Sequence, residues 1–174
     1  MPPTLSEFSI EAPVFIRKID SRARWNPEGC NTVKERAKVV AENLFREPGD
    51  LYSIWLVSTD QELYSVVASL SEYRSSKNKN IDFIWMTEEE LQEVGISPKN
   101  QPEGGCLHAR NLHFNVQIEP RMAEKLCEHL ICKGRDANRC EKKAHTTLIL
   151  AHQEQLGCKA TDSDLADCKC EQWQ

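Results

Sequence analysis

The sequence lacks the motifs that mark several common enzyme classes. It contains no G-x-G-x-x-G, no G-x-x-x-x-G-K-[ST], no G-x-S-x-G and no H-E-x-x-H. Only 7 glycines occur in 174 residues, which leaves little material for a loop that wraps a phosphate group. These absences argue against nucleotide-binding, serine-hydrolase and zinc-protease sites of the standard kinds.

Long apolar runs are also lacking. No window approaches the roughly 18 apolar residues of a membrane span, and residues 1–7 have neither the basic nor the apolar segment of a secretory signal. The net charge of −5, with basic residues mixed among acidic ones, disfavours bulk nucleic-acid binding. We therefore expect a cytoplasmic protein whose partner is another protein, with no membrane partner and with nucleic acid ranked lowest.

Three threonine-to-glutamate pairs predict where helices begin. Each pair has the spacing of a capping box, in which the threonine oxygen accepts a helical N–H and the glutamate reaches back. The pairs are Thr32 with Glu35, Thr59 with Glu62, and Thr87 with Glu90. Short apolar runs at 51–57 and 81–86 predict buried strands. Residues 12–19 predict an edge or entry strand, because Pro13 cannot donate to a ladder, and Trp55 and Trp85 are expected in the core.

The C-terminal half begins with a loop at 97–105, the best candidate for a boundary. Alternating apolar residues predict a longer strand over 106–118, and a helix then runs from Pro120 to a stop at Gly134. Asn138 with Glu141 is a candidate cap for a last helix, although residues 140–156 fit either helix or strand. We expect the chain beyond Lys159 to be irregular.

Alternating helices and strands predict an α/β (or α+β) fold. We expect a roughly four-stranded mixed sheet with at least one parallel pair, packed helices and a cysteine-rich helical C-terminal extension. The predicted division is an α/β body over 1–118 and a cysteine-rich helical subdomain over 119–174, unless the two form one continuous domain.

Cysteine is concentrated towards the C-terminus, since seven of the 8 cysteines follow residue 105. In a reducing compartment, metal thiolates or free thiols outrank disulfides, and zinc is the metal that such ligands favour. The candidate metal or redox residues are Cys127, Cys132, Cys140, His145, Cys158, Cys168 and Cys170. No C-x-x-C pair occurs, and on a helix Cys127 and Cys132 would point about 140° apart. The alternatives are that Cys127, Cys132 and Cys140 pack as small apolar side chains, or that the cysteines form disulfides in an oxidising compartment.

A second polar set follows the Gly104-Gly105 turn. Its members are Cys106, His108, Arg110 and His113. On a regular strand the first three share one face and His113 lies on the other. A histidine beside an arginine at a strand end suits phosphoryl or nucleotide chemistry. The alternative is that these histidines make ordinary hydrogen bonds at the surface or half buried.

Because no catalytic motif is complete, the sequence predicts a non-enzymatic cytosolic interaction or regulatory module with its partner surface in the C-terminal part. One alternative is a zinc- or thiol-redox-dependent regulator that uses the C-terminal cysteines. A second is a small hydrolase or nucleotide-processing enzyme that uses His108, His113 or His145. A nucleic-acid binder would need the basic residues of the 17–24 stretch to join one continuous face; these residues are Arg17, Lys18, Arg22 and Arg24.

Overall fold

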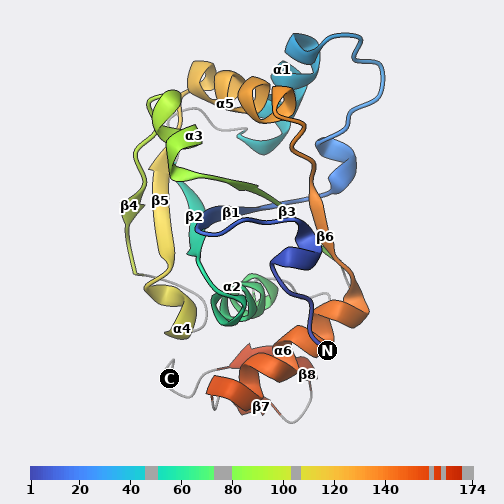
Figure 1. The fold of residues 1–174 in the computed structure, drawn as a ribbon, viewed down its shortest axis with the longest axis vertical. Coiled ribbons are helices and arrows are strands. Elements are labelled where there is room, and N and C mark those ends of the chain that lie inside the picture. The colour runs from blue at the N-terminus through green and yellow to red at the C-terminus, as the bar shows by residue number, and fades with distance from the viewer. Residues whose placement is uncertain (46–50, 73–79, 103–106, 157–158, 162–163, 170–174) are drawn as a thin grey trace.

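A sheet of six antiparallel strands separates two layers of helices (Figure 1). The computed structural model describes residues 1–45, 51–72, 80–102, 107–156, 159–161 and 164–169. In this part of the chain the strands are β1 (Val14–Ile19), β2 (Leu51–Val57), β3 (Ile81–Met86), β4 (Lys99–Asn100), β5 (His113–Gln117), β6 (Asn138–Cys140), β7 (Lys159–Thr161) and β8 (Asp164–Lys169). The helices are α1 (Val33–Leu44), α2 (Asp60–Glu72), α3 (Glu88–Glu93), α4 (Leu107–Arg110), α5 (Pro120–Cys132) and α6 (Lys142–Leu156), with short 3-10 turns η1 (Ser6–Phe8) and η2 (Arg22–Arg24).

The six strands lie in the order β4-β5-β2-β1-β3-β6, and each neighbouring pair is antiparallel. The fold is therefore α+β, and the prediction of a four-stranded mixed sheet is wrong in strand number and in direction. β2 and β3 do run parallel to each other, as helix-strand alternation indicates. They lie on opposite sides of β1, however, so the crossover through α2 joins strands that are not neighbours.

β1 lies in the middle of the sheet, which corrects the prediction of an edge strand. It pairs with β2 on one side and with β3 on the other. Pro13 imposes no restriction on this pairing, because the strand begins one residue later, at Val14. A proline just before a strand takes no place in the ladder.

The three capping boxes are confirmed. In each of them the threonine Oγ1 accepts the glutamate N–H at 3.1–3.2 Å. Each glutamate carboxylate in turn accepts the threonine N–H. Local side-chain chemistry therefore sets the starts of α1, α2 and α3, before any tertiary contact is considered.

Each face of the sheet carries its own hydrophobic core. α1, α3 and α5 cover one face, and α2, α6 and the N-terminal segment cover the other (Figure 1). Trp55 and Trp85, which were predicted to lie in the core, are only half buried. Among the described tryptophans, Trp25, from the loop after β1, is the fully buried one, and its Nε1 donates to the carbonyl of Arg135 at 3.0 Å.

The C-terminal half corrects several predictions. Residues 106–118 do not form one strand, because α4 occupies 107–110 and β5 begins at His113. Residues 142–156 are helical, which answers the question left open for 140–156, while the expected cap at Asn138 lies in strand β6. The chain beyond Lys159, expected to be irregular, contains the antiparallel pair β7–β8, and β8 packs against α2 and α6.

The described part of residues 119–169 packs against both helical layers. α5 packs on α1, α6 packs on α2, and β6 extends the sheet beside β3. None of the described helices combines the length and the apolar character that crossing a membrane would require.

A buried carboxylate fixes the β6 edge. Asp82 on β3 accepts two hydrogen bonds from Arg139 on β6, at 2.7 and 2.8 Å, and one from the backbone N–H of Arg22 at 2.9 Å. Burial by itself would raise the pKa of Asp82, but these bonds outweigh it and hold the pKa below its usual range. The charged pair therefore joins the short edge strand to the sheet and to η2.

Candidate functional site

A polar cavity lies beside α4, just before the start of β5. It has a volume of about 520 Å³ and is lined by Pro102, His108, Arg110 and Asn111. Two residues of the predicted polar set, His108 and Arg110, thus line one cavity, although they do so from a helix rather than from a strand. Cys106 lies outside the described residues. We call this cavity the α4 pocket.

The α4 pocket is held against the sheet by short backbone and side-chain bonds. Asn100 on β4 donates through Nδ2 to the carbonyls of Asn111 and His113, at 3.0 and 3.2 Å. Ala109 is buried, and the Leu112 N–H donates to its carbonyl at 3.0 Å. The C-terminal end of the short helix is therefore anchored to β4, directly before β5.

His113 is structural and does not line the α4 pocket. It is buried on β5, and its Nδ1 lies 2.6 Å from the carbonyl oxygen of Gln101. Because a carbonyl only accepts, Nδ1 carries the proton and donates it. The ring also meets Trp55 edge-on, with centroids 5.3 Å apart. His113 thus holds the chain before Pro102 against the sheet.

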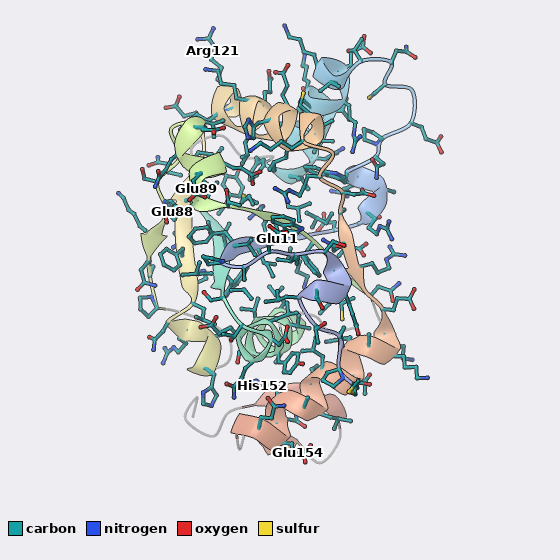
Figure 2. The ribbon with its side chains drawn as sticks, viewed as in Figure 1. Glu11, Glu88, Glu89, Arg121, His152 and Glu154 are labelled. Carbon is teal, nitrogen blue, oxygen red and sulfur yellow. The ribbon has the colours of Figure 1, made fainter. Side chains whose placement is uncertain are left out.

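The histidine that contacts His108 is not His113 but a residue outside the predicted polar set, His152. The His108 ring lies 5.9 Å from the ring of His152 on α6, at an interplanar angle of 79°. His152 is fully buried, and its Nδ1 lies 3.3 Å from the Oγ of Ser65 on α2. Figure 2 shows His152 on α6, beneath α2. The helical spacing of 145, 148, 149 and 152 marks one face of α6, but only the packing of α6 on α2 reveals the partner.

Ser65 and His152 do not form a nucleophile and base. Ser65 is 2% exposed, and its hydroxyl donates to the Gln61 carbonyl at 3.1 Å. With its one proton used, Ser65 accepts from the Nδ1–H of His152. A substrate has no access to this oxygen, so the pair serves to fix the His152 ring.

His145 has surroundings of its own. Its Nε2 is buried without a hydrogen-bond partner, and burial together with nearby Lys18 lowers its pKa to about 4. It lies two helical turns before His152 on α6. The structure therefore does not bring His108, His113 and His145 together, since each contacts different residues.

The four cysteines whose side chains the structure describes, which are Cys30, Cys127, Cys132 and Cys140, are free thiols. Cys127 on α5 and Cys140 on β6 are buried, and burial raises the pKa of each to about 12. Cys132 is exposed at the end of α5, which confirms that it and Cys127 point to different sides. Among the described residues, no three histidine, cysteine or acidic side chains gather as metal ligands would.

The remaining cysteines leave the zinc and redox alternative a prediction. Cys158 and Cys170 lie outside the described residues. For Cys168 only the backbone on β8 is described, and its strand partner is Ala160.

Thiol labelling should separate the described cysteines by burial. With iodoacetamide at neutral pH, we expect rapid modification of Cys132 and protection of Cys127 and Cys140, because a buried thiol of pKa about 12 presents almost no thiolate. Peptide mass spectrometry before and after unfolding in urea would measure this. Equal labelling of Cys127 and Cys132 in the folded protein would contradict the packing.

The basic residues of the 17–24 stretch do not form one face. Arg17 lies between two aromatic rings and donates to backbone carbonyls at the end of α1 and on β2. Lys18 donates to a carbonyl of α2. Arg22 and Arg24 make ion pairs with aspartates. Each of these side chains is thus engaged within the fold.

Comparison with known proteins identifies no relative of this chain. No protein-family model, no curated protein and no solved structure matches the chain. The function must accordingly be argued from the geometry of the α4 pocket.

Proposed function

We propose that this protein is a non-enzymatic cytoplasmic interaction module that binds a partner protein at the α4 pocket. The observation that carries the proposal is the cavity of about 520 Å³ with His108, Arg110 and Asn111 at its wall. A concave site with a few convergent polar groups is where binding is expected by default. The free thiols at the four described cysteines suit a reducing compartment.

Binding is favoured over catalysis because side chains that could act in a reaction, His113 and Ser65, are already engaged in hydrogen bonds within the fold. His113 holds the Gln101 carbonyl, and Ser65 is buried with its proton donated to α2. Catalysis would require a base and a nucleophile within hydrogen-bond reach of one substrate atom. His108, by contrast, is exposed on a well-anchored helix, as a contact residue should be.

Binding is also favoured over thiol regulation at Cys127 and Cys140. A redox-sensing cysteine needs a low pKa and access to solvent. Cys127 and Cys140 instead have pKa values raised to about 12, and both thiols are buried away from solvent.

Site-specific crosslinking tests the proposal. A photo-crosslinking residue in place of Asn111, in the α4 pocket, should capture a partner protein that mass spectrometry identifies. The matched control places the same residue at Arg121, which points outward from α5 at the opposite end of the molecule (Figure 2). We expect capture from position 111 and none of the same protein from position 121.

The purified partner then gives the quantitative result. His108→Ala with Arg110→Ala should weaken its affinity about tenfold or more, the effect of losing central interface contacts. Arg121→Ala should leave the affinity unchanged. Equal affinity for all three proteins would overturn the proposal.

A further inference from the structure

We propose that residues 1–10 are a displaceable cover, and that the face of the sheet beneath them docks a protein segment with the same apolar pattern. We call residues 1–10 the N-terminal cover. It lies on the β3 side of the sheet, where Phe8 meets Phe83, whereas α4 lies beside β5 (Figure 1). The docking surface is therefore separate from the α4 pocket, and neither depends on the other.

The N-terminal cover turns apolar side chains towards the body of the protein. Leu5 and Ile10 are buried in the core cluster that also contains Leu63 and Phe83. The half-buried Phe8 meets the Phe83 ring edge-on, with centroids 5.3 Å apart. The intervening residues are polar and exposed; these are Ser6, Glu7 and Ser9. The cover thus binds the body as an amphipathic ligand would, through positions 5, 8 and 10.

The hydrogen bonds of the N-terminal cover are almost all internal. Residues 4–10 make four backbone bonds among themselves, in and around η1. Within the described part of the chain, one hydrogen bond joins the cover to the body: the Leu5 N–H donates to Oδ1 of Asp60 on α2, at 2.7 Å. The cover takes part in none of the described strand pairs. Because undocking breaks so few polar contacts, the cover can open as a unit while the sheet stays folded.

The backbone of the N-terminal cover is strained at Ser9. Its φ of 55° lies in the left-handed region, and among the described residues no other residue except glycine has a positive φ. Ser9 ends η1 in this conformation, with its N–H donating to the Ser6 carbonyl at 3.0 Å. A serine in this region costs free energy and persists only while its surroundings hold it. Undocking removes those surroundings and therefore releases the strain.

Undocking would leave an apolar face with a carboxylate at its border. The face includes Phe83, and the carboxylate is that of Asp60, at the start of α2. An exposed apolar face marks an interaction site, and a carboxylate is a strong acceptor for a backbone N–H. We therefore expect the occupant to be a protein segment with apolar residues at positions i, i+3 and i+5, and with the N–H of residue i free to reach Asp60. A lipid chain would leave the carboxylate without a donor.

Hydrogen exchange followed by NMR tests whether the N-terminal cover opens by itself. We expect the amides of Leu5, Phe8 and Ile10 to be protected at least about a hundredfold less than those of β1 and β3, because local opening requires less free energy than global unfolding. Equal protection in the cover and in the two strands would show that they open together, and the proposal would fall.

Two carboxylate variants test the anchor at Asp60. Asp60→Asn keeps an oxygen for the Leu5 N–H but removes the charge, so protection at Leu5 and Ile10 should fall several-fold. Glu11→Gln is the matched control, because Glu11 is exposed just beyond the cover (Figure 2), and it should leave the protection unchanged. Equal protection in both variants would overturn the anchoring role of Asp60.

A peptide supplied in trans tests the docking surface. The probe is a fluorescent peptide that copies residues 1–12, and its binding to the full chain is followed by anisotropy. In the wild type the cover competes with the peptide, so the apparent affinity is reduced by the fraction of molecules in which the cover is open. The double variant Leu5→Ala with Phe8→Ala loosens the cover and keeps the face beneath it. We expect this variant to bind the peptide at least about tenfold more tightly than the wild type does.

Controls separate specific docking from general apolar binding. A peptide carrying Leu5→Ala and Phe8→Ala should bind neither protein. Circular dichroism first checks that the double variant is folded, and Phe8→Ala alone, at a half-buried position, provides a second variant with a smaller gain. Equal peptide affinity of the wild type and both variants, or equal binding of the two peptides, would overturn the proposal. A concentration-dependent dimer that the peptide dissociates would overturn the choice of another protein, because the occupant would then be the cover of a second copy.

Discussion

Replacing Glu90 by alanine should lower the free energy of unfolding by about 3 to 5 kcal/mol, the cost of removing one partner of a buried ion pair. Glu90 is 2% exposed; its carboxylate accepts from Arg135 at 2.6 Å and from the Thr87 N–H at 2.8 Å. Burial alone would raise the pKa of Glu90, but the bonds from Thr87 and Arg135 outweigh it, so the group stays charged. The substitution leaves Arg135, whose guanidinium lies over the Trp85 ring, without its carboxylate.

Two neighbouring substitutions make the measurement specific. Glu89→Ala removes an exposed carboxylate from the same helical turn (Figure 2) and should cost less than about 1 kcal/mol. Glu90→Gln keeps an oxygen for the Thr87 N–H but removes the charge, so its cost should lie in between. Urea unfolding followed by circular dichroism gives the three values. If Glu90→Ala costs no more than Glu89→Ala, the buried pair does not stabilise the fold.

Acidification should destabilise the protein between about pH 6.5 and pH 4 because of His145. Its pKa is about 4 in the fold against an ordinary value of 6.5, so the unfolded chain takes up the proton first. The stability contributed by the neutral ring is complete above pH 6.5 and is lost as the pH falls towards 4. At 1.36 kcal/mol for each pKa unit, the loss is at most about 3 kcal/mol, and the partial exposure of the ring reduces it.

His145→Leu should flatten this part of the pH profile. The variant also removes the buried Nε2 that has no partner, so its stability at pH 7 should be close to that of the wild type. Thr146→Ala, one residue later on α6, changes no titratable group and should keep the slope. Unfolding free energies measured at several pH values from 7 to 4 compare the three proteins. A slope that persists unchanged in His145→Leu would assign the effect to other groups.

Local features of the fold could be predicted from the sequence because their causes lie within a few residues. Thr32, Thr59 and Thr87 each find their capping glutamate three positions later. The apolar runs at 51–57 and 81–86 likewise carry their own strand signal, and both are strands. In contrast, nothing near Pro13 indicates that β1 will lie between two other strands.

The candidate site was predictable only in part, for the same reason. His108 and Arg110 stand out in the sequence as a close polar pair, and both line the α4 pocket. The contact of His152 with Ser65 joins residues 87 positions apart and depends on how α6 packs on α2. Trp25 shows the same limit, because the carbonyl that accepts its N–H belongs to a residue 110 positions later.

The late pairing of β6 with β3 has a consequence for synthesis on the ribosome. Phe83 pairs with Lys18 of β1 on one side, but its partner on the other side is Asn138. β3 therefore leaves the exit tunnel long before the strand that will cover its outer edge. During this interval the nascent chain presents unpaired backbone groups on an apolar strand, a template on which neighbouring chains can assemble. The period of translation between residues 86 and 140 is therefore when we expect this protein to depend most on chaperones.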